Sequence, residues 1–317
     1  MENLLIIGGS YFAGRVFIEK LISREQFNIF VFNRGNLPLN FERVAEIVGD
    51  RDQPELIRKR IPALHWDAVI DFCAYTPEHI RSLIGNLAGS VGHYILISTT
   101  TVYADTADLP VKESADKVSA PQPELGPYAD YGLNKWLAEQ ELASLSGKKG
   151  FRYTVLRPAI IYGRYNYAPR ESYFFDLIEK NRTLILPDTS LPLFSFLRVD
   201  DLASLTLKCI NEHKVSGEAF NVCGPELVSY QRLVEVLEII TGRRLQVEKL
   251  SPSEIDNHRI PLPFPLDHHL VYSCDKIREA TGFTFTPFLE GMRETWQYYQ
   301  RLSARKKNMN CRTPITP

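Results

Sequence analysis

Short apolar runs alternate with amphipathic stretches from Leu4 to Ile97. Runs such as LLII, IFVF and YILI are separated by stretches such as GRVFIEKLIS and HIRSLIGNLA, whose apolar residues recur with helical spacing. Apolar runs of about four to seven residues predict strands buried on both faces, and the stretches between them predict the helices that cover those faces. The alternation therefore predicts an α/β fold with a Rossmann-type, doubly wound parallel sheet.

The periodicity weakens after Gly163, where an aromatic and irregular segment begins. We expect a Rossmann dinucleotide-binding domain at residues 1–165 and about 192–224, a smaller C-terminal substrate lobe at about 166–191 and 225–305, and a flexible tail at 306–317. The aromatic residues of the segment are expected in the core, at a homodimer interface or in a wall of the substrate lobe. They are Tyr165, Tyr167, Tyr173, Phe174 and Phe175.

Charge and composition favour a small-molecule partner. The chain carries 37 basic and 38 acidic residues, so no global field recruits nucleic acid or an anionic membrane. The five cysteines lack any CxxC pair, and the adjacent His268 and His269, like His258, lack ligand spacing, so neither disulfides nor a metal is expected. No apolar run approaches the ~20 residues that span a bilayer, and we expect a cytoplasmic protein.

The first predicted strand ends in the glycine-containing segment GGSYFAG. Gly8 and Gly14 bracket a strand-to-helix junction, where glycine permits positive φ and close approach of a pyrophosphate, and the following helix supplies free N–H groups. The middle glycine of the pattern GxxGxxG is replaced by Tyr11. The turn is therefore a candidate dinucleotide site, although such turns also occur for structural reasons alone.

The second predicted strand ends in Asn33 and Arg34, where an NAD-specific enzyme commonly carries an acidic residue. The Arg34 guanidinium can pair with the 2′-phosphate of NADP, which favours NADP over NAD, unless Arg34 is only a solvated arginine at a strand end. Asp50, after the third strand, is expected to accept a hydrogen bond from the adenine amine.

Tyr131 and Lys135 lie four residues apart on a predicted helix, so both project from one face. Free tyrosine has a pKa near ~10 and is a poor base, but a lysine ammonium ~4 Å away contributes about 4 kcal/mol toward the phenolate at an effective dielectric of ~20. Thr99 ends a buried strand in ISTTTVYA and can hydrogen-bond the substrate oxygen on which the tyrosine acts. The three residues are candidates for a general acid–base site.

These motifs together resemble the extended short-chain dehydrogenase/reductase family, of the NAD-dependent epimerase/dehydratase type. The matching segments occur in the family's order from about Leu4 to Gly224. They are GGSYFAG, GDRD, ISTTTVY, YGLNK, LRPAIIYG, RVDDLA and FNVCG. The resemblance implies hydride transfer to and from nicotinamide, with Thr99, Tyr131 and Lys135 as the catalytic triad.

By the same resemblance, further residues are expected at the cofactor and the substrate. The expected cofactor-binding residues are Gly8, Ser10, Tyr11, Phe12, Gly14, Asn33, Arg34, Asp50, Arg51, Ala74, Tyr131, Lys135 and Pro158, and the expected substrate-binding residues are Tyr75, Thr100 and Arg198. The implied activity is that of an epimerase or reductase on a sugar-like or sugar-nucleotide hydroxyl or ketone.

Two departures from the family pattern restrict the reaction. Thr100 and Thr101 stand where sugar-nucleotide 4,6-dehydratases carry an acidic pair, which makes that dehydration unfavourable. Phe194 stands near the place of an arginine that clamps the diphosphate in epimerases, so either Arg198 or Arg259 substitutes or the substrate is not a diphosphate sugar.

The segments NRG and CAYTPEHIRSL resemble an atypical branch of the family that includes chloroplast stem-loop RNA-binding proteins. This suggests an alternative function, a nucleotide-sensing RNA-binding protein without turnover. The net charge of -1, the absence of a basic stripe interleaved with aromatics and the intact YxxxK spacing argue against it, and no nucleic-acid partner is expected.

Overall fold

A computed structural model gives the structure of residues 1–189 and 191–310. The chain forms two compact units, and each is assembled from three chain segments. Unit 1 comprises Met1–Ala159, Val199–Cys223 and Tyr272–Phe285. Unit 2 comprises Ile160–Arg198, Gly224–Val271 and the chain from Thr286 onward.

Unit 1 contains a parallel sheet of seven strands in the order β10-β6-β5-β4-β1-β2-β3. The strands are β1 (Glu2–Ile7), β2 (Phe27–Asn33), β3 (Val44–Val48), β4 (Leu64–Asp71), β5 (Gly89–Ile97), β6 (Arg152–Pro158) and β10 (Glu218–Val222). The chain order reverses between β1 and β4, the topological switch point at which such sheets bind ligands. The predicted doubly wound Rossmann sheet is confirmed.

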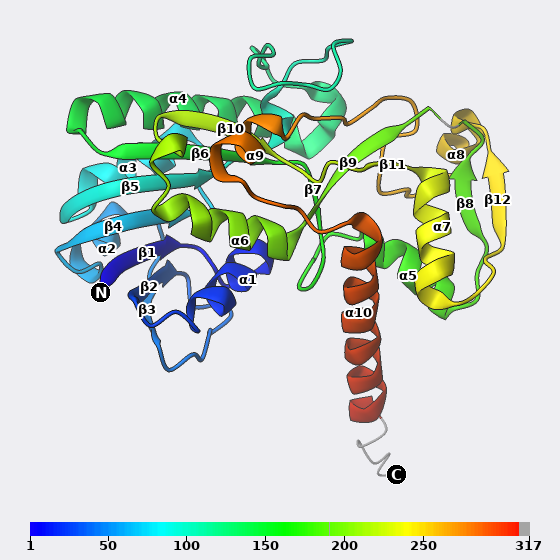
Figure 1. Ribbon diagram of the computed structural model, residues 1–317, viewed down its shortest axis with the longest axis horizontal. Coiled ribbons are helices and arrows are strands. Elements are labelled where there is room, and N and C mark those ends of the chain that lie inside the picture. The colour runs from blue at the N-terminus through cyan, green and yellow to red at the C-terminus, as the bar shows by residue number, and fades with distance from the viewer. Residues whose placement is uncertain (190, 311–317) are drawn as a thin grey trace. The chain divides into compact units, whose positions relative to one another are not determined.

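Helices cover both faces of this sheet, with α2, α3 and α4 on one face and α1 and α6 on the other (Figure 1). The helical elements of unit 1 are α1 (Phe12–Leu21), α2 (Pro54–Arg60), α3 (Pro77–Asn86), η1 (Thr100–Val102), η2 (Pro123–Tyr128), α4 (Tyr131–Lys149), α6 (Val199–Ile210), η3 (His213–Val215) and α9 (Asp275–Thr281). Because both faces are covered, the central strands bury nearly every side chain, as Leu4 to Ile7 of β1 show.

Unit 2 is built around aromatic side chains, including Phe174, Phe175, Phe194 and Trp296. It contains two small sheets, of three and two strands. Its elements are β7 (Ile160–Tyr162), α5 (Glu171–Glu179), β8 (Leu184–Pro187), β9 (Leu193–Arg198), β11 (Leu227–Ser229), α7 (Tyr230–Thr241), β12 (Val247–Leu250), α8 (Pro252–Asn257) and α10 (Phe288–Asn310). Rings from separate segments pack together, such as Phe175 against Trp296 with centroids 5.0 Å apart.

The compact units differ from the predicted domain limits in three places. Residues 193–198 form β9, which pairs with β7 and β11 of unit 2 instead of extending the large sheet. The segment Tyr272–Phe285 belongs to unit 1, where Tyr272 forms a β-bridge with Val111. Helix α10 continues through Asn310, so residues 306–310 of the expected tail are helical, and 311–317 lie outside the described residues.

Candidate functional site

The glycine turn after β1 is shaped by close contact between backbone segments. Gly8 and Gly9 have φ values of 91° and 90°, in the left-handed region that favours glycine. A Cβ on Gly14 would lie 2.5 Å from the Cα of Gly9, so the first turn of α1 packs directly on the backbone of the turn. Gly8 and Gly14 were predicted from the sequence but Gly9 was not, although the GG doublet is a signal for it.

Helix α1 begins immediately after this turn. Tyr11 occupies the N-cap position without a side-chain cap hydrogen bond and is 56% exposed, whereas Phe12 is buried. Ser10 is half-buried beside them. Residues 8–14, which include five of the predicted cofactor-binding residues, thus form a strand-to-helix turn in which the N-cap side chain makes no capping hydrogen bond, and such a helix N-terminus suits a phosphate group.

The end of β2 presents one arginine to solvent. The amide of Asn33 is held within the protein, since its Nδ2 donates to Glu46 at 2.8 Å and its Oδ1 accepts from the Gly35 N–H at 2.7 Å. Arg34 is exposed, and no hydrogen bond or ion pair joins it to any residue in 1–189 or 191–310. Of the two residues predicted here, Arg34 has the side chain that is available to a ligand.

Arg51, predicted to bind the cofactor, is directed into the protein. Its Nη1 donates to Asp71 at 2.9 Å and its Nη2 donates to the His79 carbonyl at 3.0 Å. Asp71 is fully buried at the end of β4 and also accepts from the Tyr94 hydroxyl at 2.6 Å. Burial alone would raise the pKa of Asp71, but Arg51 and these hydrogen bonds hold it below the usual range.

Asp50 lies half-buried at the start of the same turn. Its carboxylate accepts a hydrogen bond from the Asp52 N–H at 3.1 Å, which shapes the turn between β3 and α2. The second carboxylate oxygen is the group that could meet an adenine amine.

Lys135 joins the ends of two neighbouring strands. Its side chain is 1% exposed, and its ammonium donates to the carbonyls of Ala74, after β4, and Ile97, at the end of β5, at 2.7 Å each. Burial lowers the pKa of Lys135 to about 8, against the opposing influence of the Asp71 and Glu139 carboxylates. An ammonium has three donors, so these two carbonyls leave one hydrogen for another acceptor.

Tyr131 and Thr99 are carried by segments that pack closely. A Cβ on Gly132 would lie 2.4 Å from the Thr101 carbonyl oxygen, so the first turn of α4 rests on η1. The Thr99 hydroxyl accepts from the Thr101 N–H at 3.1 Å, and the Tyr131 ring centroid lies 6.4 Å from that of Tyr75. The structure therefore brings the Tyr131 helix, the Thr99 segment and the Tyr75 loop together.

A buried polar network behind these residues was not predicted from the sequence. Glu139, on α4, accepts hydrogen bonds from Ser98 and from Arg157 of β6, and both charged side chains are almost completely buried. Arg157 also donates to the Tyr103 hydroxyl at 2.8 Å, and Tyr103 donates to Asn221 at 2.6 Å. Ser98 and Arg157 lie 41 and 18 residues from Glu139, so no local spacing in the sequence signals the network.

The remaining predicted site residues have different surroundings. Thr100 is buried at the start of η1, and Pro158 is buried at the end of β6 beside Val222. Arg198 lies in unit 2, where its guanidinium contacts Glu294 and donates to Thr286 at 3.1 Å. Its charge is therefore already paired within that unit, which weakens its case as a clamp for a diphosphate.

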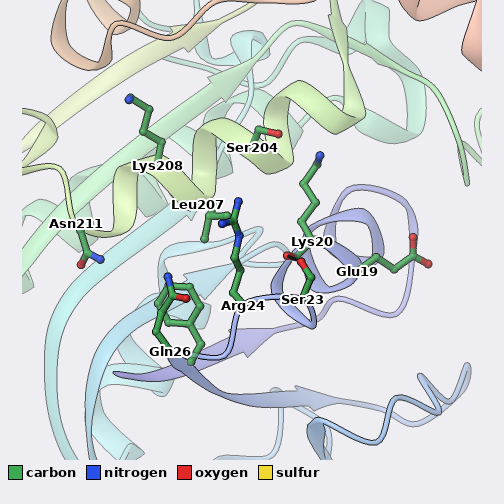
Figure 2. Close-up of a pocket in the computed structure, with 10 residues that line it drawn as sticks. Glu19, Lys20, Ser23, Arg24, Gln26, Ser204, Leu207, Lys208 and Asn211 are labelled. Atoms are coloured by element: carbon green, nitrogen blue, oxygen red, sulfur yellow. Dashed lines mark hydrogen bonds between the residues drawn. The ribbon is translucent and has the colours of Figure 1, made fainter. Parts of the chain in front are cut away.

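A cavity of about 600 Å³ lies where α1 and α6 end and β2 begins (Figure 2). Lys20 and Arg24 extend toward α6, whose Leu207 and Lys208 also line the cavity. Lys20 and Lys208 stand in the last turns of their helices, where positive charge offsets the negative end of the helix dipole. The cavity is at the opposite end of α1 from the glycine turn and is separate from the candidate site.

Within residues 1–189 and 191–310, no group of three or more His, Cys, Asp and Glu side chains is arranged to hold a metal ion. No helix among these residues is long and apolar enough to cross a membrane.

Comparison with known proteins relates the chain to nucleotide-dependent enzymes. A family model described as the NAD dependent epimerase/dehydratase family matches residues 4–223. The chloroplast stem-loop binding protein of 41 kDa b of Arabidopsis thaliana is 25% identical over 298 residues, which cover 89% of this chain and 75% of that protein. A putative UDP-glucose 4-epimerase of Methanocaldococcus jannaschii is 23% identical over 282 residues, which cover 82% and 89%.

Solved structures share the fold. The UDP-glucose 4-epimerase of Thermotoga maritima, solved with UDP-glucose, has a TM-score of 0.74 at 18% identity and matches over 95% of this chain and 99% of that one. The UDP-glucuronic acid 4-epimerase of Bacillus cereus, solved with UDP-glucuronic acid and NAD, has a TM-score of 0.73 at 17% identity, with the same coverage.

Proposed function

The chain belongs to the NAD-dependent epimerase/dehydratase family, and we propose that it is an epimerase or reductase that interconverts a hydroxyl and a ketone on a sugar-like substrate. The resemblance inferred from the sequence and the prediction of an NAD-dependent family enzyme are confirmed at that level. We further propose the class of substrate, the preferred dinucleotide and the role of each site residue.

One observation carries it, the buried ammonium of Lys135. Burying an ammonium to 1% exposure is costly unless hydrogen bonds offset it, and two carbonyls, after β4 and at the end of β5, hold this one in place. That edge of a doubly wound sheet is where ligands bind. The remaining ammonium hydrogen suits a ribose hydroxyl, and the positive charge favours the phenolate of Tyr131 on the same helix face.

The glycine turn fits a dinucleotide. Because Gly14 has no side chain, helix α1 packs directly on the backbone of Gly9. This close packing leaves the N–H groups at the start of α1 within reach of a pyrophosphate. When bound, the nicotinamide group accepts and returns a hydride. During oxidation Tyr131, as the phenolate, accepts the proton of the substrate hydroxyl while Thr99 hydrogen-bonds the same oxygen. During reduction Tyr131 returns that proton to the carbonyl oxygen.

Arg34 supports a preference for NADP. It is exposed and available at the end of β2, and Asn33 holds the backbone of the following glycine so that the turn is ordered. A guanidinium pairs with a 2′-phosphate through charge-assisted hydrogen bonds. The acidic side chain that contacts Asn33, Glu46, accepts from the Asn33 amide and from the Leu39 N–H, so its carboxylate is engaged within the protein and not presented to ribose hydroxyls as an NAD-specific carboxylate would be.

The proposal is tested with the wild-type protein and Tyr131→Phe. Both are titrated calorimetrically with NAD, NADP and their reduced forms, and both are assayed on a panel of sugars and sugar nucleotides. We expect Tyr131→Phe to keep dinucleotide affinity and to lose turnover by 10²-fold or more, the effect typical of removing a general acid–base group. Wild-type turnover by Tyr131→Phe would show that the catalytic assignment is wrong.

A structured-RNA mobility shift distinguishes the second function, which the similarity to the stem-loop binding protein keeps open. An RNA binder without turnover would shift RNA equally with or without the Tyr131 hydroxyl. No heat with any of the four dinucleotides, together with tight RNA binding, would replace the enzyme proposal by this one.

A further inference from the structure

Three successive turns of α4 contact the segment that closes β5. Gly132 packs against the Thr101 carbonyl, and Lys135 donates to the Ile97 carbonyl at 2.7 Å. One turn later, Glu139 accepts a 2.5 Å hydrogen bond from the Ser98 hydroxyl. The helix that carries Tyr131 is therefore fixed on the strand end that carries Thr99 at three points.

At the third point, Glu139 is also part of a buried ion pair with Arg157. Arg157 of β6 donates from Nε to both oxygens of Glu139 at 3.1 Å and from Nη2 to Oε2 at 2.5 Å. Both side chains are 3% exposed, so water contributes little and the geometry is set by the protein. Arg157 is itself held by the Tyr103 hydroxyl at 2.8 Å. The Glu139 carboxylate thus has one fixed orientation toward Ser98.

The Ser98 bond acts on the relative position of two groups that both belong to α4 but are held differently. The Lys135 ammonium, at the end of a long side chain, is hydrogen-bonded to carbonyls after β4 and at the end of β5, whereas the Tyr131 ring is placed by the first turn of α4. Their separation therefore depends on how α4 sits on β5. Charges interact as the inverse of distance, so at an effective dielectric of ~20 an increase from ~4 to ~6 Å changes an equilibrium by about tenfold.

We propose that Glu139 is a positioning residue of the proposed reaction, which seats α4 on the end of β5 through Ser98 and so sets Tyr131 against Lys135 and Thr99. The proposal rests on the proposed function for its catalytic meaning. The geometric claim stands on the Ser98–Glu139–Arg157 contacts alone, and it concerns residues that do not touch the substrate.

Several charged or titratable groups surround the pair on which Glu139 acts. Asp71 and Cys73 act on Lys135 from β4 and its following loop, Arg51 acts from the turn before α2, and Glu139 acts from α4. The Tyr75 ring lies 5.6 Å from the Lys135 ammonium and 6.4 Å, centroid to centroid, from Tyr131. Ser98→Ala changes none of these groups. It therefore directly tests whether the position of α4 on the end of β5 affects Tyr131.

The experiment is a pH titration of tyrosines labelled with ¹³C at the ring carbon that bears oxygen. The Tyr131 signal is identified by its absence from Tyr131→Phe. Wild type is compared with Ser98→Ala, Glu139→Gln and the control Thr154→Val. Thr154 is a fully buried hydroxyl that donates to the Val215 carbonyl at 2.8 Å and hydrogen-bonds His93 at the same distance, and neither partner belongs to the Ser98–Glu139–Arg157 contacts.

We expect Ser98→Ala and Glu139→Gln to lower the phenolate fraction of Tyr131 about tenfold at a given pH, and to lower kcat more than they raise KM on any panel substrate. Thr154→Val should lower the thermal midpoint and leave the Tyr131 titration unchanged. Ser98→Ala keeps the ion pair, so it decides the question even if Glu139→Gln fails to fold. A Tyr131 titration in Ser98→Ala equal to that of wild type overturns the proposal.

The titration needs no substrate, which separates this test from that of the proposed function. Loss of turnover in Tyr131→Phe with an unchanged titration in Ser98→Ala rejects only the role of Glu139. A changed titration in Ser98→Ala with full turnover in Tyr131→Phe rejects the catalytic assignment and keeps the seating.

Discussion

The glycine turn at residues 8–14 and the junction of α4 with β5 belong to the same unit, yet they are built by opposite means. In the turn, two backbone segments approach so closely that a single Cβ on Gly14 would lie 2.5 Å from Gly9. In the junction, buried charged side chains from α4 and β6 determine the positions. The turn is sensitive to atoms that are added, and the junction is sensitive to polar atoms and charges that are removed.

The largest effect is expected where the junction loses its cation. Lys135→Met should reduce turnover by 10²-fold or more and weaken dinucleotide binding, because the ammonium is assigned both to Tyr131 and to the ribose. Lys208→Met, at an exposed position on α6, is the control and should retain both properties. Kinetics and calorimetric titration measure turnover and dinucleotide affinity in the two variants. Equal values for Lys135→Met and Lys208→Met would show that Lys135 is not a site residue.

The same variant has a signature in stability. Burial lowers the pKa of Lys135 to about 8 in the folded protein, below the value of ~10.4 for an unfolded chain. Between these pH values the unfolded state binds more protons, so the free energy of unfolding of the wild type should rise with pH over this interval. Urea unfolding at a series of pH values should show a smaller rise in Lys135→Met. An unchanged rise would mean that Lys135 is not the group that titrates.

The turn is tested by adding one methyl group. Gly14→Ala forces a Cβ against Gly9 and should cost about 1–3 kcal/mol of unfolding free energy, with dinucleotide affinity at least about tenfold weaker. Gly147→Ala is the matched control, because its Cβ meets nothing within 4 Å on helix α4. That change should stabilise the protein by about 0.5–1 kcal/mol. If both alanines act alike, crowding at the turn is not its defining property.

The smallest effect concerns the exposed side chain beside the turn. Arg34→Ala should weaken NADP about tenfold and leave NAD nearly unchanged, since a charge-assisted contact at an exposed site contributes about 1.5–3 kcal/mol before screening by salt. Arg24→Ala, at an exposed position after α1, serves as the control. Competitive titration at low salt measures both cofactors. Equal losses for NAD and NADP would show that Arg34 only shapes the turn.

The same contrast explains what could be predicted from the sequence. The turn is local: a strand, a glycine doublet and a helix follow within a few residues, and the apolar runs predict the parallel sheet around them. Tyr131 and Lys135 were also predictable as a pair, because helical spacing alone places them on one face. Their contacts with Ala74 and Ile97 required the fold.

The junction depends on contacts between distant residues. Ser98 and Glu139 are 41 residues apart, and Arg157 and Glu139 are 18 apart, so no window of the sequence contains the network. Arg51 illustrates the same limit. Its type and position suggested a cofactor ligand, but its partner Asp71, 20 residues away, holds the guanidinium inside the protein. The limits of the units were missed at β9 for a similar reason, since its strand partners lie elsewhere in the chain.

Unit 1 draws its residues from three stretches of the chain, and this has a consequence for synthesis on the ribosome. Strand β10 pairs with β6 only after residue 222 has been made, and Tyr272 meets Val111 only after a further excursion through unit 2. Until β10 is made, the open edge of β6 exposes unpaired backbone groups. The large sheet of unit 1 therefore cannot be completed until residue 222 has emerged, and a nascent chain that stalls earlier presents a sheet edge to chaperones and to other chains.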